Sequence, residues 1–269
     1  MFDSHCHLDA EEYDVDRDEV LARASAAGIT GIMVPGYEPR EWQRLASLCQ
    51  RDRRVVCAVG LHPLYLHELS SDARSEALAA LPDWLTKTGA LAVGEFGLDA
   101  LVAKQGGLDL DAQCEVVRAH LALPRELALP VIVHCVRAHG RMLELLDHFG
   151  PLTRGGVLHA YGGPAELIRR YARLNFRFSF GGIVTHPRAK RPRAALAAVP
   201  RELLLVETDG PSQVPAGSLR ARSEPSDVAQ VLEVAAELRG EPLALLARAT
   251  SLNACALFGC DPARFAPHA

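Results

Sequence analysis

Short apolar runs and amphipathic segments alternate regularly along the whole of this 269-residue chain. The apolar runs are typical of strands in a parallel sheet, which are buried on both faces. Strict alternation of such strands with helical patterns predicts a parallel sheet whose crossovers are helices. Eight strands are predicted, at residues 2–6, 31–34, 55–60, 91–94, 130–134, 156–159, 176–181 and 203–207.

Helical patterns fill the segments between these strands and follow the last one. Eight strand–helix units favour closure into a barrel, since a (β/α)8 barrel typically takes about 250 residues. We therefore predict an α/β protein, with one single-domain (β/α)8 TIM barrel over residues 1–269. Two irregular stretches, 98–111 and 210–225, are predicted to be active-site loops. The predicted helices are 16–27, 41–51, 75–87, 112–127, 140–149, 164–174, 188–198, 226–239 and 242–258.

The composition of the chain limits which classes of protein and of binding partner are compatible with it. Hydrophobic residues make up 49% and charged residues 23% of the chain, as in ordinary globular proteins. The net charge of −4 excludes a global basic field, so nucleic acid could bind only through a local patch. Seven cysteines without a Cys-x-x-Cys pair favour free thiols in a reducing compartment. No signal-peptide pattern opens the chain and no apolar run reaches the roughly 18 residues of a membrane span, so we expect a cytoplasmic protein without a membrane partner.

Side chains of the kinds that bind metals stand at the ends of five predicted strands. Active sites of (β/α)8 barrels lie at the carboxyl ends of the strands. Two of the histidines are separated by one residue and would share one face of the first strand. Taken singly, each histidine could be a satisfied core residue and the aspartate a helix cap; a metal site explains all of them together. The predicted ligands are His5, His7, Glu95, His134, His159 and Asp209.

The types of the predicted ligands indicate which metal ions could bind and how many. Four imidazoles and two carboxylates suit zinc, manganese, iron or nickel better than calcium. Six ligands exceed the three that usually hold one catalytic zinc, so we predict two divalent ions, with Glu95 as the bridge between them. A metal-bridging hydroxide would be the nucleophile, because a bound metal lowers the pKa of water towards about 7.

Several segments together resemble the TatD family of metal-dependent hydrolases, a branch of the amidohydrolase-like (β/α)8 barrels. The matching segments occur in order and cover nearly the whole chain. They are Asp3-Ser4-His5-Cys6-His7-Leu8-Asp9, Gly60-Leu61-His62-Pro63, Gly94-Glu95-Phe96-Gly97-Leu98-Asp99, Leu129-Pro130-Val131-Ile132-Val133-His134, His159-Ala160-Tyr161-Gly162-Gly163, Gly182-Ile183-Val184-Thr185, Leu204-Leu205-Val206-Glu207-Thr208-Asp209-Gly210-Pro211 and residues 253–259.

The resemblance implies a divalent-metal-dependent nuclease, typically a deoxyribonuclease that acts on DNA ends. Candidate ions are zinc, magnesium and manganese. His62 is expected to face the substrate, and the catalytic residues are Glu95 and Asp209, the latter orienting or deprotonating the attacking water. The implied ligands of one ion are His5, His7, Glu95 and Asp209. The implied ligands of the second ion are Glu95, His134 and His159.

The chain departs from the family pattern at four places, none of which carries a predicted ligand. An aromatic residue usually follows the Gly-Leu-Asp motif, where this chain has Ala100. The arginine that often occupies position 136 comes one residue later, as Arg137, and is predicted to bind substrate. Ser223 replaces the asparagine of an Asn-Glu-Pro motif, and His120 replaces a glutamine. These departures concern the identity of the substrate rather than the metal site.

A cationic stretch follows the seventh predicted strand and contains Arg188, Lys190 and Arg191. Loops at this place in (β/α)8 barrels often bind phosphate, so these residues are predicted to bind substrate; the alternative is a solvated helix start. Arg220 and Arg222 in the loop after the eighth strand add to the cationic charge.

Two further pairs of residues have predicted roles around the metal ligands. Aromatic residues make up only 6% of the chain, which argues against a long base-stacking platform. Tyr65 and Tyr161 are candidates for stacking one terminal base, with core packing as the alternative. Asp99 and Glu207 are predicted to orient ligand histidines.

Three functions are compatible with these residues. The leading hypothesis is phosphodiester hydrolysis from DNA ends, single-stranded or frayed, by an exodeoxyribonuclease. The second keeps the metals but changes the bond to an amide, a lactone or an aminoacyl-tRNA ester, because chemistry on this fold varies with its loops. The third is a non-enzymatic metal-binding or scaffold protein, against which the complete ligand set argues. The sequence does not indicate an oligomeric state.

Overall fold

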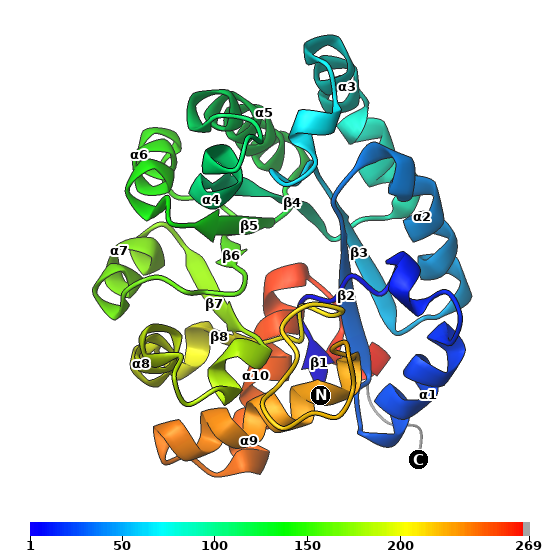
Figure 1. Ribbon diagram of the computed structural model, residues 1–269, viewed down its shortest axis with the longest axis vertical. Helices are drawn as coiled ribbons and strands as arrows, with labels where there is room; N and C mark the ends of the chain where they lie inside the picture. Colours follow the sequence, from blue (N-terminus) through cyan, green and yellow to red (C-terminus); the bar gives the residue numbers. More distant parts are fainter. Residues whose placement is uncertain (266–269) are drawn as a thin grey trace.

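The computed structural model describes residues 1–265, so the last four residues of the predicted domain lie outside the described part. Eight parallel strands form one sheet, in which each strand pairs with the next one along the chain. Helices surround this sheet in a ring (Figure 1), which confirms the predicted (β/α)8 barrel. The strands are β1 (Phe2–Asp3), β2 (Gly31–Gly36), β3 (Val55–Val59), β4 (Ala92–Asp99), β5 (Val131–Val136), β6 (Gly156–Leu158), β7 (Phe176–Phe180) and β8 (Leu204–Val206).

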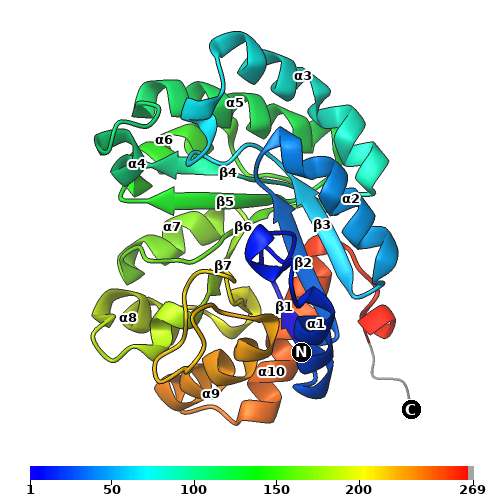
Figure 2. The ribbon, with the colours of Figure 1, turned by 45° about the vertical axis from the view of Figure 1, so that its right-hand side comes forward.

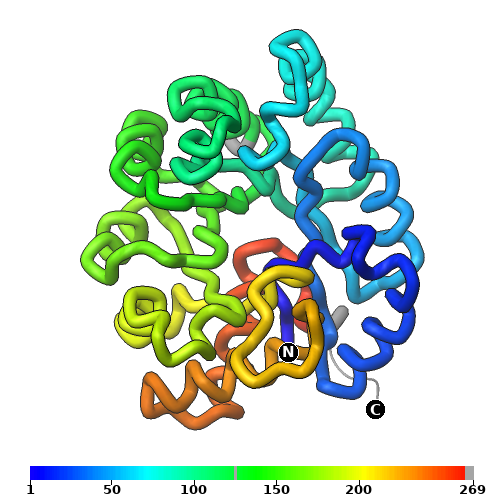
Figure 3. Tube along the Cα trace, viewed as in Figure 1, coloured from blue at the N-terminus to red at the C-terminus, as the bar shows by residue number. Residues whose placement is uncertain are grey.

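The barrel closes where the chain segment after β1 meets β8. The Ser4 N–H donates a hydrogen bond to the Val206 carbonyl (3.0 Å), and the Asp209 N–H donates to the His5 carbonyl (2.8 Å). Figure 3 shows the start of the chain (blue) next to the golden loop that follows β8. Closure therefore juxtaposes the first and last metal-type residues of the sequence.

The helices cover the outside of the barrel, and one of them contributes to its inner core. Apolar side chains from seven strands form an inner cluster with residues of the last long helix, in which the rings of Phe2 and Phe258 are 6.1 Å apart. Figure 2 shows this helix beside β1. The helices are α1 (Arg17–Ala26), α2 (Trp42–Arg51), α3 (Ser71–Thr88), α4 (Ala100–Lys104), α5 (Leu110–Leu127), α6 (His139–Phe149), α7 (Ile168–Arg173), α8 (Lys190–Ala198), α9 (Val228–Arg239) and α10 (Leu243–Phe258).

Strand β1 ends earlier than predicted, and β4 ends later. Because β1 covers only two residues, His5 and His7 lie beyond it, and the same-strand argument for their placement was wrong. Backbone hydrogen bonds hold that segment instead, from Cys6 N–H to the Met33 carbonyl (3.0 Å) and from His7 N–H to the Gly210 carbonyl (2.8 Å). Tertiary contacts, rather than strand alternation, therefore orient the two histidines.

The segment after β4 is more regular than its composition predicts. Strand β4 runs to Asp99, whose side chain accepts hydrogen bonds from Leu101 N–H (2.7 Å) and Val102 N–H (3.0 Å) and so caps α4. An aspartate at this place satisfies amide groups that the first helical turn leaves without partners. The prediction of a wholly irregular stretch over 98–111 was therefore wrong.

The loop after β8 reaches the cavity described below with its first residues, since Pro211 and Ser212 line that cavity, whereas its later part is held by ion pairs. Glu224, which is buried, forms an ion pair with Arg23 (2.8 Å). Arg220 pairs with Asp227, and Arg222 pairs with Asp16. Arg220 and Arg222 are thus engaged by carboxylates, which removes the reason for assigning them to phosphate binding.

Among the described residues, no helix combines the length and apolar character of a membrane span.

Candidate metal centre

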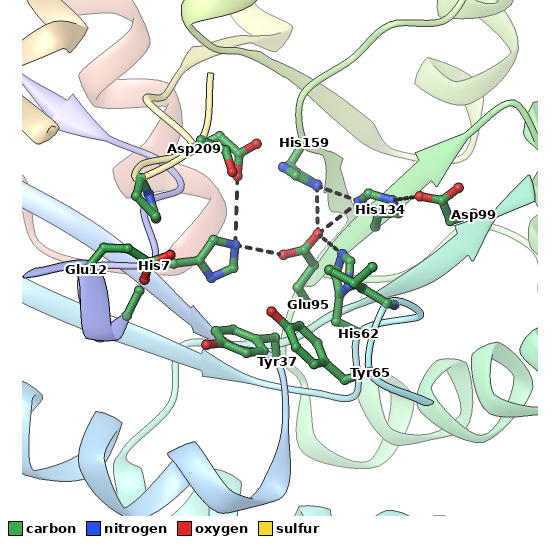
Figure 4. A pocket seen from close by; sticks show the side chains of 14 residues that line it. His7, Glu12, Tyr37, His62, Tyr65, Glu95, Asp99, His134, His159 and Asp209 are labelled. Carbon is green, nitrogen blue, oxygen red and sulfur yellow. Dashed lines mark hydrogen bonds and ion pairs between the residues drawn. The ribbon is translucent and has the colours of Figure 1, made fainter. Parts of the chain in front are cut away.

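A cavity of about 320 Å³ opens at the carboxyl ends of the strands, where the predicted ligands gather. Its polar wall comes from segments after β1, β3, β6 and β8 and from β4 and β5 themselves (Figure 4). Apolar side chains of the strands and of α10 pack together inside the barrel. The cavity is therefore lined by side chains near the carboxyl ends of the strands and in the segments that follow them. The histidines and acidic residues that line it are His7, Glu12, His62, Glu95, Asp99, His134, His159 and Asp209.

Glu95 lies at the centre of the cluster and is completely buried. Its Oε2 atom is 3.0 Å from His5 Nε2 and 3.5 Å from His7 Nε2. Its Oε1 atom faces three other imidazoles, at 2.7 Å from His159 Nε2, 3.1 Å from His62 Nε2 and 3.2 Å from His134 Nδ1. The two oxygens of one carboxylate thus serve two separate groups of histidines.

Asp209 lies beside the first of these groups. Its Oδ1 atom is 3.7 Å from His5 Nε2 and 3.8 Å from His7 Nε2, while Oδ2 accepts a hydrogen bond from Gln213 Nε2 (2.8 Å). The backbone of Asp209 has a φ of 53°, in the left-handed region that aspartate tolerates better than most residues. This backbone conformation and the Gln213 contact aim Oδ1 at the histidines.

Close contact between β4 and β5 places Glu95 and His134 together. Gly94 and Gly97 flank the glutamate, and a side chain at either position would collide with the β5 backbone, at Ile132 and His134 respectively. Gly94 also has a φ of 137°, a conformation open mainly to glycine. The Gly-Glu-Phe-Gly segment is therefore what lets the carboxylate approach the neighbouring imidazole.

Two further carboxylates, of Asp99 and Glu207, lie next to the candidate ligands His134 and His159. Asp99 Oδ2 is 3.0 Å from His134 Nε2, which fits its predicted orienting role. Glu207 Oε1 accepts a hydrogen bond from Ala160 N–H (2.6 Å) and is 3.6 Å from His159 Nδ1, so it acts on that ring mainly through its charge.

Asp3 was not singled out from the sequence, although it belongs to the same support. It is buried and accepts hydrogen bonds from His5 N–H (3.2 Å), Thr208 N–H (3.0 Å) and Thr208 Oγ1 (2.6 Å). It thereby ties the segment after β1 to the segment after β8. Its place one residue after a hydrophobic strand start was the available signal, but its partner lies at the other end of the chain.

The cluster stabilises charge of both signs. Burial raises the pKa of a carboxyl group, yet His159, His62 and His5 hold the pKa of Glu95 well below its usual value. Burial lowers the pKa of an imidazole, yet Glu95 and Glu207 raise the pKa of His159 well above its usual value. Burial and the neighbouring His5 lower the pKa of His7 to about 3. Glu95 is therefore ionised and attracts cations, while His7 is neutral and has a lone pair to donate.

The residues fit a metal site on their unsatisfied atoms. Both Glu95 oxygens and the Nδ1 atoms of His5, His7 and His159 are buried without a hydrogen bond of good geometry to any described residue. Imidazole nitrogens also converge in pairs, with His5 Nε2 and His7 Nε2 3.3 Å apart. A buried carboxylate without a compensating partner is costly, and a divalent cation would compensate it. Three overlapping groups of these side chains are close enough to hold an ion, one of which contains His62.

The predicted substrate residues divide into two sets. His62 lies in the cavity, as does Tyr65. Arg137, Arg188, Lys190 and Arg191 are exposed and are not among the residues that line it, in the part of the chain that the structure describes. Their predicted contact with substrate stays a prediction.

Tyr161, a candidate from the sequence, is not among the residues that line the cavity, whereas Tyr37 is. Tyr161 is only 1% exposed, and its hydroxyl donates to the Pro164 carbonyl (2.8 Å), so its predicted stacking on a base was wrong. Tyr37, which follows β2 and was not considered, lines the cavity instead. No pattern within its own segment distinguishes it from a surface tyrosine, because its neighbours in the cavity come from other strands.

The chain is similar to known proteins over almost its whole length. The family model described as TatD related DNase matches residues 2–259. The chain is 35% identical over 258 residues to the uncharacterized metal-dependent hydrolase YabD of Bacillus subtilis, covering 96% of this chain and 98% of the relative. It is 34% identical over 266 residues to a protein of Citrobacter rodentium named 3'-5' ssDNA/RNA exonuclease TatD, covering 96% and 98%.

A solved structure has the same architecture. The crystal structure of YjjV, a TatD homologue from Escherichia coli, superimposes with a TM-score of 0.88 at 32% identity, covering 97% of this chain and 98% of that one. Both the sequence match and the structural match extend over almost the full length. Since the family model, the relatives and the fold agree, this chain belongs to the TatD family of metal-dependent hydrolases.

Proposed function

We propose that this protein hydrolyses phosphodiester bonds at the ends of single-stranded or frayed DNA, with two divalent ions in the cavity. The observation that carries the two-ion site is the division of the Glu95 oxygens between two groups of histidines. A relative with 34% identity that is named for 3'-5' exonuclease activity on single-stranded DNA and RNA supports a nucleic acid substrate.

The proposed ligands follow that division. Both sets share Glu95, and Asp99 and Glu207 support them from behind. His62, which the resemblance assigns to the substrate, is near enough to Glu95 Oε1 to act as a further ligand before substrate binds. One ion would be held by His5, His7, Glu95 and Asp209. The other would be held by Glu95, His134 and His159.

The chain's own residues would perform distinct tasks in the reaction. Divalent ions bound here supply Lewis acidity to a phosphoryl oxygen and lower the pKa of water. Asp209 Oδ1, held towards the cavity by the Gln213 contact on its other oxygen, accepts a proton from the attacking water. Asp99 fixes the ring of His134 and so the direction of its Nδ1 lone pair.

A different substrate remains a second candidate, because the cavity has an apolar wall. Tyr37, Leu64 and Tyr65 line it, whereas the predicted phosphate-binding cations do not. Such a wall would also suit the side chain of an aminoacyl ester. Analysis of products separates the two: release of mononucleotides from an oligonucleotide, abolished by a chelator, supports the nuclease, and release of amino acids from aminoacyl-tRNA supports the esterase.

An end-directed enzyme should distinguish linear from circular DNA. The small cavity would admit one terminal unit rather than clamp a long duplex. We expect linear single-stranded DNA to be degraded to mononucleotides and a closed single-stranded circle of the same sequence to be spared, as measured by electrophoresis. The same circle, once nicked, serves as the control. Efficient cutting of the intact circle would contradict the end-directed reading.

Neutralising two exposed cations should weaken substrate binding without stopping the chemistry. Lys190 and Arg191 form no ion pair with an acid in the described part of the chain. We expect Lys190→Gln/Arg191→Gln to raise the Michaelis constant and to reduce the log–log salt slope of binding by about one unit for each lost phosphate contact. The matched control is Arg201→Gln, because Arg201 is already paired with Glu241 (2.6 Å). An unchanged slope in the double variant would mean that this stretch is only solvated surface.

A further inference from the structure

Two tyrosines from different strand ends form a stacked pair on one wall of the cavity. Tyr37 follows β2 and Tyr65 follows β3, and their ring centroids are 4.7 Å apart at an interplanar angle of 28°. Figure 4 shows the pair side by side, beneath Glu95 and His62. The ring centroids of Tyr37 and His7 are 5.1 Å apart with the rings nearly perpendicular, and those of Tyr65 and His62 are 6.3 Å apart. The pair therefore spans both groups of candidate ligands.

Core packing does not account for this pair. Both rings are partly exposed, and Leu64 beside them is 44% exposed although it is a large apolar residue. All three side chains line the cavity. A flat aromatic surface next to an apolar side chain fits a planar, weakly polar group, and a nucleobase is such a group.

A second hollow, which is acidic, adjoins the tyrosine pair. It is lined by Tyr37 and Tyr65 together with Glu11, Glu12, Glu38, Arg40 and Glu41, and of these acids Glu12 also lines the metal cavity. Arg40 pairs with Glu38 (2.6 Å), which leaves Glu11, Glu12 and Glu41 without an ion pair among the residues described here. A phosphate backbone would be repelled if it continued past the tyrosines in this direction.

The opposite side of the barrel mouth is cationic. Arg137 follows β5, and Arg188, Lys190 and Arg191 lie between β7 and the first turn of α8. Figure 1 places β2 and β3 to the right of the barrel and β7 and α8 to the left. Charge around the mouth thus changes sign from the tyrosine side to the α8 side.

We propose that the Tyr37–Tyr65 pair receives the base of the terminal nucleotide, while the rest of the strand leaves the cavity towards α8. The proposal rests on the proposed nuclease function and names its terminal-base subsite. The tyrosines hold the last base, the candidate ligands lie beside the adjoining phosphate, and the acidic hollow prevents a strand from extending beyond the pair. A strand end is then required for productive binding, and one nucleotide is released per cleavage.

The test compares substrates that have a terminal base with substrates that lack it, using the metal-loaded wild type and two variants. The substrates are two single-stranded oligodeoxynucleotides that differ only in whether the terminal residue carries a base or is abasic, made for each end in turn. The proteins are the wild type, Tyr37→Leu/Tyr65→Leu, which keeps apolar bulk but removes the rings, and Tyr37→Phe/Tyr65→Phe, which keeps the rings. The measured quantity is the ratio of the Michaelis constant for the abasic substrate to that for the intact one.

Stacking of one base on an aromatic side chain corresponds to roughly a 5- to 150-fold change in affinity. We expect the wild-type ratio to be about tenfold or more at one end of the strand, to be retained in the Phe/Phe protein, and to fall close to one in the Leu/Leu protein. Quenching of 2-aminopurine fluorescence at that terminal position should follow the same order, which gives a readout independent of turnover.

The possible outcomes distinguish failure of the terminal-base subsite from failure of the proposed nuclease function. A wild-type ratio close to one at both ends, or an unchanged ratio in the Leu/Leu protein, would overturn the terminal-base subsite while leaving the nuclease function intact. If the wild-type protein releases no nucleotides from either oligonucleotide, the nuclease function is wrong and the subsite falls with it.

Discussion

Glu95→Gln should remove both ions and lower turnover by about a thousandfold or more, the upper scale for losing an electrostatic partner of the transition state. The reason is geometric, because a single buried carboxylate faces five imidazoles within 3.5 Å. Glutamine has nearly the same shape but no charge, and its NH2 group would point a donor at one histidine group. Elemental analysis of the purified variant, together with turnover at saturating metal, measures both effects.

A peripheral ligand provides the matched comparison. His134 belongs to only one of the two proposed ligand sets, so His134→Ala should lose about one of the two ions. The difference in metal content between the two variants tests the bridging role itself. Two ions per chain in Glu95→Gln would contradict it, and full metal content in His134→Ala would remove that histidine from the ligands.

Asp209→Asn should lower turnover by at least about a hundredfold, the scale of lost general-base assistance. Asparagine retains one oxygen and the shape of the side chain but cannot accept a proton from water. Gln213 Nε2 already holds one oxygen of Asp209, so the variant can keep that contact and the position of the side chain. Turnover should be measured at saturating metal, with the metal content of the same sample determined in parallel.

Metal content distinguishes the two roles proposed for Asp209. Lost turnover with full metal content would support the general base, whereas lost metal would support a ligand role. Gln213→Ala is the matched control, since it frees the carboxylate without neutralising it and should cause a smaller fall. Near-normal turnover of Asp209→Asn would leave Asp209 only its structural place at the end of β8.

The architecture could be predicted because it depends on local patterns. Apolar strands that alternate with helical patterns specify a parallel barrel whatever the details of the loops. The candidate ligands could be found for the same reason, since each lies within a strand or in the segment that follows one, and the barrel brings strand ends to one face. Even so, β1 stopped at Asp3 and β4 continued to Asp99, because pairing with neighbouring strands decides where a strand ends.

The surroundings of the ligands were less accessible from the sequence. Asp3 contacts His5 locally, but it also binds Thr208 from the other end of the chain and so ties the two segments together at the barrel closure. Arg222 adds to the cationic charge in the sequence, but in the folded protein Asp16 pairs with it. In both cases the deciding contact joins residues far apart in the sequence.

The sequence by itself determined the barrel, the set of six metal-type residues and their position at the strand ends, because hydrophobic periodicity and residue chemistry are local properties. Only the tertiary structure decided how the oxygens of Glu95 divide among the histidines, that Tyr37 and Tyr65 stack, and that an acidic hollow adjoins these two tyrosines. Those relations join side chains from different strands, and their distances and directions follow from barrel closure and loop packing, which no single segment of the sequence encodes.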